Sequence, residues 1–312
     1  MSLLGNLRRY LGNLALRLKL AAARNLLRGP WRWEALDALG VYGHGTDLLR
    51  VDFPPATDGR PAWGHGRPPH PELAELFRDT LPAQLELLRA CLAHADDYRR
   101  WPQHEDAARP ELPWRDNMFL PPFDAAALYG MLRHTRPERY VEIGSGISTR
   151  VAGRARAAGA FPMEIISIDP APRVAVEKLC NQIHRQRLEA LPAKEFLQLV
   201  TPRTVVFFDG SHRSFPGSDV TIFFLNLLLR LPAGAIVHLH DIYLPEDYPP
   251  QFFPRLWSEQ YLLATWLLGG ARRLQVLLPC AYLASLPAPR ELLVAALGTD
   301  NFGGSSFWLR MT

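Results

Sequence analysis

The chain has 312 residues, of which 48% are hydrophobic, and its formal net charge is +4 at pH 7. This length suits one large domain with additions or two small ones, and the apolar content is ordinary for a globular protein. So mild a positive charge does not indicate a nucleic-acid binder. Cys91, Cys180 and Cys280 are widely spaced and odd in number, which argues against a disulfide framework or a cysteine metal site and fits a reducing cytoplasm. No apolar run approaches the roughly 18 residues that a membrane span needs.

Residues 1–29 form the first predicted element, a basic and leucine-rich helix that ends at Gly29-Pro30. Such a helix could rest on an anionic membrane surface, pack on the rest of the chain, or bind a partner that includes a second copy of the protein. Gly5 and Gly12 weaken the helix, which favours packing on the rest of the chain. The next residues, up to about 70, are rich in proline and glycine and predict turns.

Two further helices are predicted before the first strand. Leucines recur at helical spacing over residues 71–99, and Pro82 is a point at which this helix could break in two. Residues 100–122 again predict a loop. A helix over 124–134 follows, with Asp124 as its N-cap. We expect this helix to precede the first strand and to cover the ligand crevice.

From residue 139 onward, predicted strands and helices alternate, as a parallel sheet requires. The predicted strands are 139–143, 163–168, 186–189, 204–208, 235–239, 274–278 and 305–310. The predicted helices are 148–158, 172–181, a helix begun by Pro192, 219–231 and 257–268. The pattern predicts an α/β fold, a doubly wound, mostly parallel sheet of seven strands with the last one antiparallel at the edge. We divide the chain into a basic helix (1–30), a helical and irregular cap (31–116) and a ligand-binding domain (117–312).

The first strand ends in Gly144-Ser145-Gly146, and a helix begins near Ser148. A strand, a glycine turn and a helix N-terminus form the ligand-binding unit of doubly wound proteins, because glycine allows close backbone approach and free N–H groups face the ligand. Thr149 stands where a dinucleotide fingerprint requires glycine or alanine, and Glu142 would repel a phosphate. The turn therefore suits a cationic nucleoside without phosphate better than NAD.

Ionisable residues follow the other parallel strands. Asp169 ends the second strand, where its carboxylate could accept hydrogen bonds from both hydroxyls of a ribose. The fourth strand is followed by Asp209 and His212, and the fifth by His240 and Asp241. An acid at a strand end can also cap the next helix. Because ligands of open α/β sheets bind at the carboxyl ends of the strands, these residues are the predicted site.

Four segments in order resemble the class I S-adenosylmethionine (SAM) methyltransferases of the bacterial small-molecule and sugar O-methyltransferase type. They are Glu142-Ile-Gly-Ser-Gly-Ile-Ser-Thr149, Ser167-Ile-Asp-Pro170, Phe208-Asp-Gly-Ser-His212 and His238-Leu-His-Asp-Ile-Tyr243. The resemblance covers about residues 117–261. It implies that SAM is the cofactor, with its methionine part held by Glu142, Gly144, Ser145 and Gly146, with Ser148 alongside. It also implies that Asp169 binds the ribose and that Asp209 lies beside the methionine amine and the acceptor.

In metal-using relatives, an acid after strand four and an acid pair after strand five hold Mg²⁺. Asp209 and Asp241 match this pattern, but His240 replaces a carboxylate, and an imidazole suits Mn²⁺ or Fe²⁺ better. In a metal-free site, His212 or His240 would act as general base, oriented by Asp209 or Asp241. The loop 243–254, with Tyr243, Glu246, Asp247 and Tyr248, is expected to form part of the acceptor site.

We therefore expect a cytoplasmic enzyme that methylates a hydroxyl of a sugar or natural product, with a small-molecule acceptor and no nucleic-acid partner. Three alternatives stay open at this point. An NAD(P)-dependent oxidoreductase could use a similar sheet, and the pair His240-Asp241 is compatible with a metal-dependent hydroxylase. A non-catalytic scaffold could retain the fold and bind a partner through residues 1–29.

Overall fold

The computed structural model describes residues 60–172, 174–270 and 272–312. The predicted basic helix over residues 1–29 and the irregular segment up to residue 59 lie outside the described residues. Among those described, no helix combines the length and the apolar character that would let it cross a membrane.

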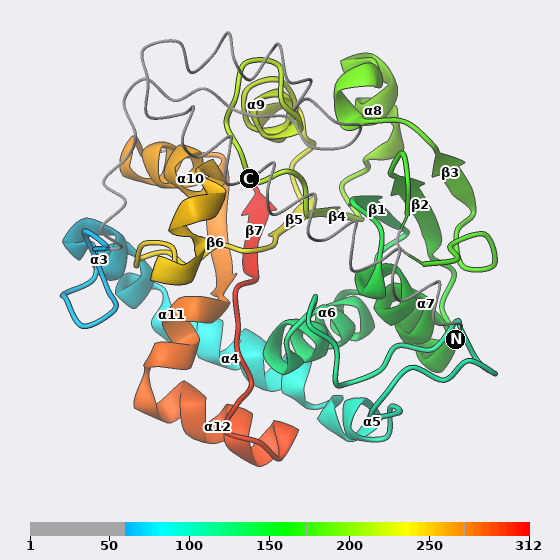
Figure 1. Cartoon of the computed structure of the whole chain (residues 1–312), viewed down its shortest axis with the longest axis horizontal. Helices are drawn as coiled ribbons and strands as arrows, with labels where there is room; N and C mark the ends of the chain where they lie inside the picture. The colour runs from blue at the N-terminus through cyan, green and yellow to red at the C-terminus, as the bar shows by residue number, and fades with distance from the viewer. Residues whose placement is uncertain (1–59, 173, 271) are drawn as a thin grey trace, which may run out of the picture. The chain divides into compact units, whose positions relative to one another are not determined.

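Within the described part of the chain, seven strands form one sheet with the order β3-β2-β1-β4-β5-β7-β6 (Figure 1). The strands are β1 (Arg139–Ile143), β2 (Glu164–Ile168), β3 (Gln182–His184), β4 (Thr204–Phe208), β5 (Ile236–Leu239), β6 (Leu274–Pro279) and β7 (Phe307–Met311). The first five are parallel, and β7 is antiparallel to both β5 and β6. The direction of winding changes between β1 and β4, which is the switch point where such sheets bind ligands. The prediction of a mostly parallel α/β sheet is confirmed.

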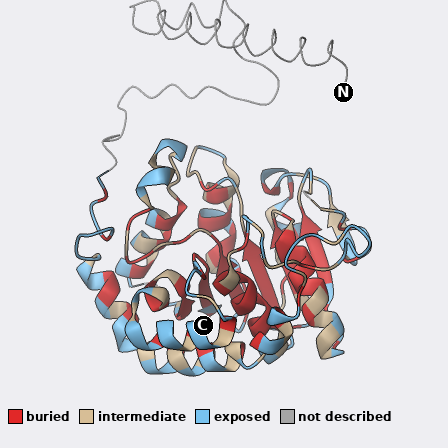
Figure 2. Ribbon diagram, turned by 60° about the horizontal axis from the view of Figure 1, so that its bottom comes forward, coloured by how far each residue is buried: buried red, intermediate tan, exposed pale blue. Residues whose placement is uncertain are grey.

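The strands at the centre of the sheet are buried on both faces, and Figure 2 shows them almost wholly in the colour of buried residues. Runs such as Val205-Val206-Phe207-Phe208 explain this, because a parallel sheet is covered by helices on both sides. In Figure 1, α4, α5, α6, α7 and α12 lie on one side of the sheet, and α8, α9 and α10 lie on the other. The helices are α3 (Pro71–Asp79), α4 (Leu81–Leu92), α5 (Ala95–Arg99), α6 (Pro122–Thr135), α7 (Ile147–Gly159), α8 (Ala193–Leu199), α9 (Asp219–Ile222), α10 (Glu259–Leu268), α11 (Cys280–Ser285) and α12 (Pro287–Leu297).

The predicted helix over 71–99 is three helices. The first break falls at Thr80, and Pro82 lies in the first turn of α4, where its missing N–H is no loss. The predicted helix over 124–134 begins earlier, at Pro122, so the prediction that Asp124 is its N-cap is wrong. Asp124 lies inside the first turn of α6 and is completely buried.

The predicted helix over 172–181 is absent, since the described residues there form bends and turns. Arg156 of α7 donates to the Leu179 carbonyl at 2.9 Å and to the Asn181 side chain, also at 2.9 Å, so polar groups of this segment bond to α7 instead of within a helix. The third strand lies at residues 182–184, not at 186–189, and pairs with β2 over only three residues.

The predicted apolar helix over 219–231 is α-helical only through Ile222. It continues as a π-helical turn, η2 (Phe223–Leu227), and a 3-10 turn, η3 (Leu228–Arg230). Two other short 3-10 segments are η1 (Leu188–Ala190) and η4 (Pro250–Arg255).

The last strand is antiparallel, as predicted, but it is not an edge strand. β7 lies between β5 and β6, and β6 forms the edge. Its residues Phe307, Trp308 and Leu309 are fully buried, as a strand with neighbours on both sides and helices on both faces requires.

Candidate active site

The turn after β1 is fixed by its glycines. Gly144 has φ +82°, and a Cβ there would lie 2.0 Å from the Asp209 carbonyl oxygen, so no other residue fits without a shift of the backbone. The Asp209 N–H donates to the Ile143 carbonyl at 3.0 Å, which holds the ends of β1 and β4 together. A Cβ at Gly146 would meet nothing within 4 Å. The backbone at the start of α7 is therefore open to a ligand.

Asp169 joins the end of β2 to this turn. Its Oδ2 accepts from the Ser145 N–H at 2.7 Å, and its Oδ1 accepts from the Ala171 N–H at 2.7 Å. The Ser145 and Ser167 hydroxyls are also within hydrogen-bond distance, at 2.7 Å. The structure thus brings together the glycine turn and the carboxylate that the sequence assigned to one cofactor.

Glu142 lies beneath the turn and is completely buried. The Tyr140 hydroxyl donates to its Oε1 at 3.0 Å, and the Thr149 hydroxyl forms a short hydrogen bond with its Oε2. Burial raises the pKa of Glu142 to about 7, although hydrogen bonds from Ser148, Thr149 and others act to lower it. The Thr149 hydroxyl also accepts from the Gly146 N–H at 3.1 Å. Thr149, which stands where a dinucleotide fingerprint requires glycine or alanine, thus connects the buried Glu142 to the glycine turn.

Four predicted site residues converge where β4 and β5 end. His212 Nε2 lies 3.3 Å from Asp209 Oδ1 and 3.6 Å from Asp241 Oδ2. His240 Nδ1 lies 3.8 Å from Asp209 Oδ1 and 3.7 Å from Asp241 Oδ2. His212 and Asp241 both adopt positive φ angles, 60° and 57°, which are uncommon for residues other than glycine. We call Asp209, His212, His240 and Asp241 the strand-end cluster.

Two carboxylates that the sequence did not assign to the site complete it. Glu259, the first residue of α10, forms a short hydrogen bond with His212 Nδ1. Asp124 lies 3.5 Å from His240 Nε2 and accepts from the N–H groups of Ser305, at 2.9 Å, and Ser306, at 2.8 Å. Both acids are in the first turn of a helix, where the helix dipole ordinarily stabilises a negative charge. Their position in the sequence therefore gave no signal of a role in the site.

The close carboxylates perturb the pKa of each imidazole. Burial acts to lower the pKa of His212, but Glu259 and Asp209 outweigh it and raise that pKa well above its usual value. Burial acts in the same direction on His240, whose pKa is nevertheless raised by Asp241, by Asp124 and by Asp209. Burial acts to raise the pKa of Asp209, but both imidazoles outweigh it and hold this pKa well below its usual range.

Asp209, His240 and Asp241 could hold a metal ion. Each offers one ligand atom, and these atoms all lie within 4.8 Å of one another. His240 is 3% exposed, yet neither ring nitrogen has a hydrogen-bond partner among the described residues. Two carboxylates and an imidazole are ligands that suit Mn²⁺ or Fe²⁺. The donor atoms therefore fit the metal that the sequence suggested.

The acids of the loop after β5 face a different part of the chain. Asp247 is buried and accepts from the Ala62 N–H at 2.5 Å and from the Tyr261 hydroxyl at 2.7 Å. Glu246 lies 3.8 Å from His65 Nε2. These two residues, which the sequence placed in the acceptor site, thus contact the segment before α3.

The order of the strands, the single antiparallel strand inserted next to the edge, and the glycine turn at the switch point define a Rossmann-like fold of the class I methyltransferase type. Residues 141–242 match a family described as a methyltransferase domain. Residues 141–242 are therefore similar to a methyltransferase domain and lie in a sheet of the class I methyltransferase topology. A search of curated proteins found no match.

Solved structures of methyltransferases resemble the chain at low sequence identity. One is the SAH-bound methyltransferase PaMTH1 of Podospora anserina, with a TM-score of 0.38, 18% identity, and coverage of 71% of this chain and 88% of that one. Another is the plantazolicin methyltransferase BamL in complex with a triazolic desmethylPZN analog and SAH. Its TM-score is 0.39, its identity is 9%, and the alignment covers 77% of this chain and 99% of that one.

Proposed function

We propose that this protein transfers the methyl group of SAM to a hydroxyl of a small molecule, a sugar or another natural product. The observation that carries the proposal is the convergence of Asp209, His212, His240 and Asp241 beside the glycine turn. The sulfonium of SAM already activates the methyl group. What the chain has to supply is alignment of the acceptor and a place for its proton.

The glycine turn fits the cofactor. The open backbone at Gly146 leaves room for a ligand at the start of α7. Each oxygen of Asp169 accepts one N–H bond, and a carboxylate oxygen has a second lone pair for a ribose hydroxyl. We assign the methionine part of SAM to Ser145, Gly146 and Ser148, with Glu142 supporting the turn from below.

The strand-end cluster fits a cation. With Asp124 and Glu259, four carboxylates surround the two imidazoles, so negative charge is in excess even if both rings are protonated. We assign a divalent ion to Asp209, His240 and Asp241. When bound, such an ion lowers the pKa of a coordinated hydroxyl. Asp124 lies 3.5 Å from Nε2 on the far side of the His240 ring, and Glu259 orients His212 so that Nε2 faces the cluster.

Calorimetry with SAM and transfer of a labelled methyl group to pools of small molecules test the proposal. We expect His240→Ala and His212→Ala to bind SAM within a few-fold of wild type and to lose roughly 10²–10⁴-fold in transfer. His104→Ala, which removes an exposed imidazole, is the matched control. A wild-type protein that does not bind SAM, or two variants that transfer as fast as wild type, would contradict the proposal.

Removal of metal separates the two routes for the acceptor proton. We expect dialysis against EDTA to abolish transfer and Mn²⁺ or Fe²⁺ to restore it. Transfer that survives the chelator would refute the metal assignment and leave the route through His212, oriented by Glu259, in which the imidazole must first lose its own proton because its pKa is raised.

A further inference from the structure

An arginine and two aromatic rings form a stacked platform next to the strand-end cluster. Phe252 of η4 and Trp257 stack with their ring centroids 4.7 Å apart and their planes at 21°. The Arg255 guanidinium lies 5.2 Å from the Phe252 centroid and 4.9 Å from that of Trp257. Trp257 also contacts two further rings, His212 at 4.4 Å and Tyr248 at 5.8 Å between centroids. A single indole ring therefore separates the guanidinium from a member of the cluster.

Hydrogen bonds fix this platform to the loop after β4. Arg213 Nε donates to the Arg255 carbonyl at 2.9 Å, and the Ser258 N–H donates to the His212 carbonyl at 2.7 Å. The Ser214 N–H donates to the Ser258 hydroxyl at 2.9 Å. The platform and His212 are thus parts of one connected unit, in which hydrogen bonds hold the backbone of Arg255 and ring contacts hold its guanidinium.

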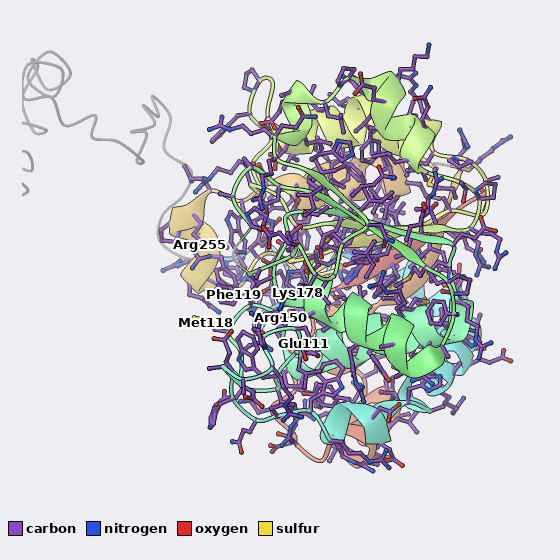
Figure 3. The ribbon with its side chains drawn as sticks, turned by 90° about the vertical axis from the view of Figure 1, so that its right-hand side faces the viewer. Glu111, Met118, Phe119, Arg150, Lys178 and Arg255 are labelled. Carbon is purple, nitrogen blue, oxygen red and sulfur yellow. The ribbon has the colours of Figure 1, made fainter. Side chains whose placement is uncertain are left out.

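The two arginines of this unit have no acidic partner within residues 60–172, 174–270 and 272–312. Arg255 contacts aromatic rings, and Arg213 contacts a carbonyl oxygen. Eight other arginines of the described chain form ion pairs, whereas several more, Arg290 among them, share with Arg255 and Arg213 the lack of an acidic partner among the described residues. Arg255 is exposed and is labelled in Figure 3 in the same part of the view as Phe119 and Met118. Two guanidiniums without an acidic partner among the described residues therefore belong to the unit that carries His212.

We propose that the acceptor carries an oxyanion, a carboxylate or a phosphate, that binds Arg255 and Arg213. A guanidinium recognises the paired oxygens of such a group through parallel N–H bonds. The body of the acceptor passes the edge of Trp257, and its hydroxyl reaches the strand-end cluster. This inference rests on the proposed function and specifies its substrate class as anionic hydroxy compounds.

Anion exchange of a labelled pool tests the inference. The full-length protein and labelled SAM are incubated with a small-molecule extract, and the products are separated into retained and unretained fractions. We expect the label in the retained fraction. Pretreatment of the extract with a phosphatase removes the label if the group is a phosphate, and amidation of carboxylates removes it if the group is a carboxylate.

Variants connect the retained product to the platform. We expect Arg255→Gln and Arg213→Gln each to reduce kcat/KM for that product about tenfold, as loss of a charge-assisted hydrogen bond does, with SAM affinity unchanged. Arg255→Lys keeps the positive charge but not the planar guanidinium, so its kcat/KM should lie between those of wild type and Arg255→Gln. Arg290→Gln is the matched control, since Arg290 also stacks on a ring, 5.1 Å from the Phe302 centroid, but lies in α12.

The inference and the proposed function fail in different ways. Label found only in the unretained fraction, or Gln variants that match wild type on a retained product, would overturn the anionic acceptor and leave methyl transfer intact. Failure of the wild type to bind SAM would overturn the proposed function itself. Thermal unfolding of each variant shows whether the change in rate reflects loss of the fold.

Discussion

The buried carboxyl of Glu142 makes a testable contribution to the pH dependence of stability. The pKa of this group is raised from 4.5 to about 7 in the folded chain, and burial is the principal cause. One pKa unit corresponds to 1.36 kcal/mol. The difference of about 2.5 units is therefore equivalent to roughly 3 kcal/mol.

The sign follows from the proton that each state holds. Below pH 4.5 the carboxyl is protonated whether the chain is folded or unfolded, so Glu142 adds no pH dependence. As the pH rises from 4.5 to 7, the unfolded chain loses the proton while the folded chain keeps it, and the free energy of unfolding falls. Above pH 7 both states are ionised and the loss is complete.

Glu142→Gln removes this titration and retains a polar side chain of the same size. Urea unfolding of the cofactor-free protein at pH 5 and pH 8 measures the effect. We expect the free energy of unfolding of the variant, relative to that of wild type, to be roughly 3 kcal/mol higher at pH 8 than at pH 5. Glu138→Gln is the control, because Glu138 pairs with Arg203 at the surface and its replacement should change stability by less than about 1 kcal/mol at both pH values. The same difference between the Glu142 variant and wild type at pH 5 and at pH 8 would refute the reasoning.

The remaining predictions concern the glycine turn and two buried or half-buried acids. Gly144→Ala should lower stability by more than about 1–2 kcal/mol and lower the melting temperature, because of its φ angle and the contact with Asp209, whereas Gly146→Ala should melt like wild type but bind SAM more weakly. Asp124→Ala leaves two backbone N–H groups without their acceptor and should reduce the free energy of urea unfolding by about 2–4 kcal/mol. Asp169→Ala should reduce SAM affinity in calorimetry by at least about tenfold, the effect of losing hydrogen bonds to a charged group, and an unchanged affinity would contradict its assignment to the ribose.

Local patterns predicted the parts of the fold that depend on local burial. The boundaries of β1 and β4 are those expected from apolar, β-branched runs that end at a glycine or an aspartate. The helix predicted over 172–181 is wrong because polar groups of this segment accept hydrogen bonds from Arg156 of α7. That residue lies more than fifteen positions earlier in the chain, so no local pattern shows the contact. The place of β7 depends on pairing with β5, and no local pattern in either strand specifies that partner.

The expectation that ligands bind at strand ends identified all four members of the strand-end cluster and missed the two further site acids, which come from helices. Asp209, His212, His240 and Asp241 follow strands, so their meeting at one edge of the sheet could be predicted. Asp124 and Glu259 enter the site because α6 and α10 begin there. That arrangement depends on the whole fold. An acid in the first turn of a helix is common, so its presence in the sequence does not indicate a functional site.

The insertion of β7 between β5 and β6 determines when the sheet can be completed during synthesis of the chain. β7 leaves the ribosome after the other six strands, so β5 keeps an unpaired edge until nearly all of the described chain has been made. The backbone N–H groups that donate to Asp124 belong to Ser305 and Ser306, immediately before β7. These two residues follow Asp124 in the sequence by 181 and 182 positions. A nascent chain that stalls before this strand would carry a formed cofactor turn but no fixed partner for His240, and an exposed sheet edge that other chains could extend.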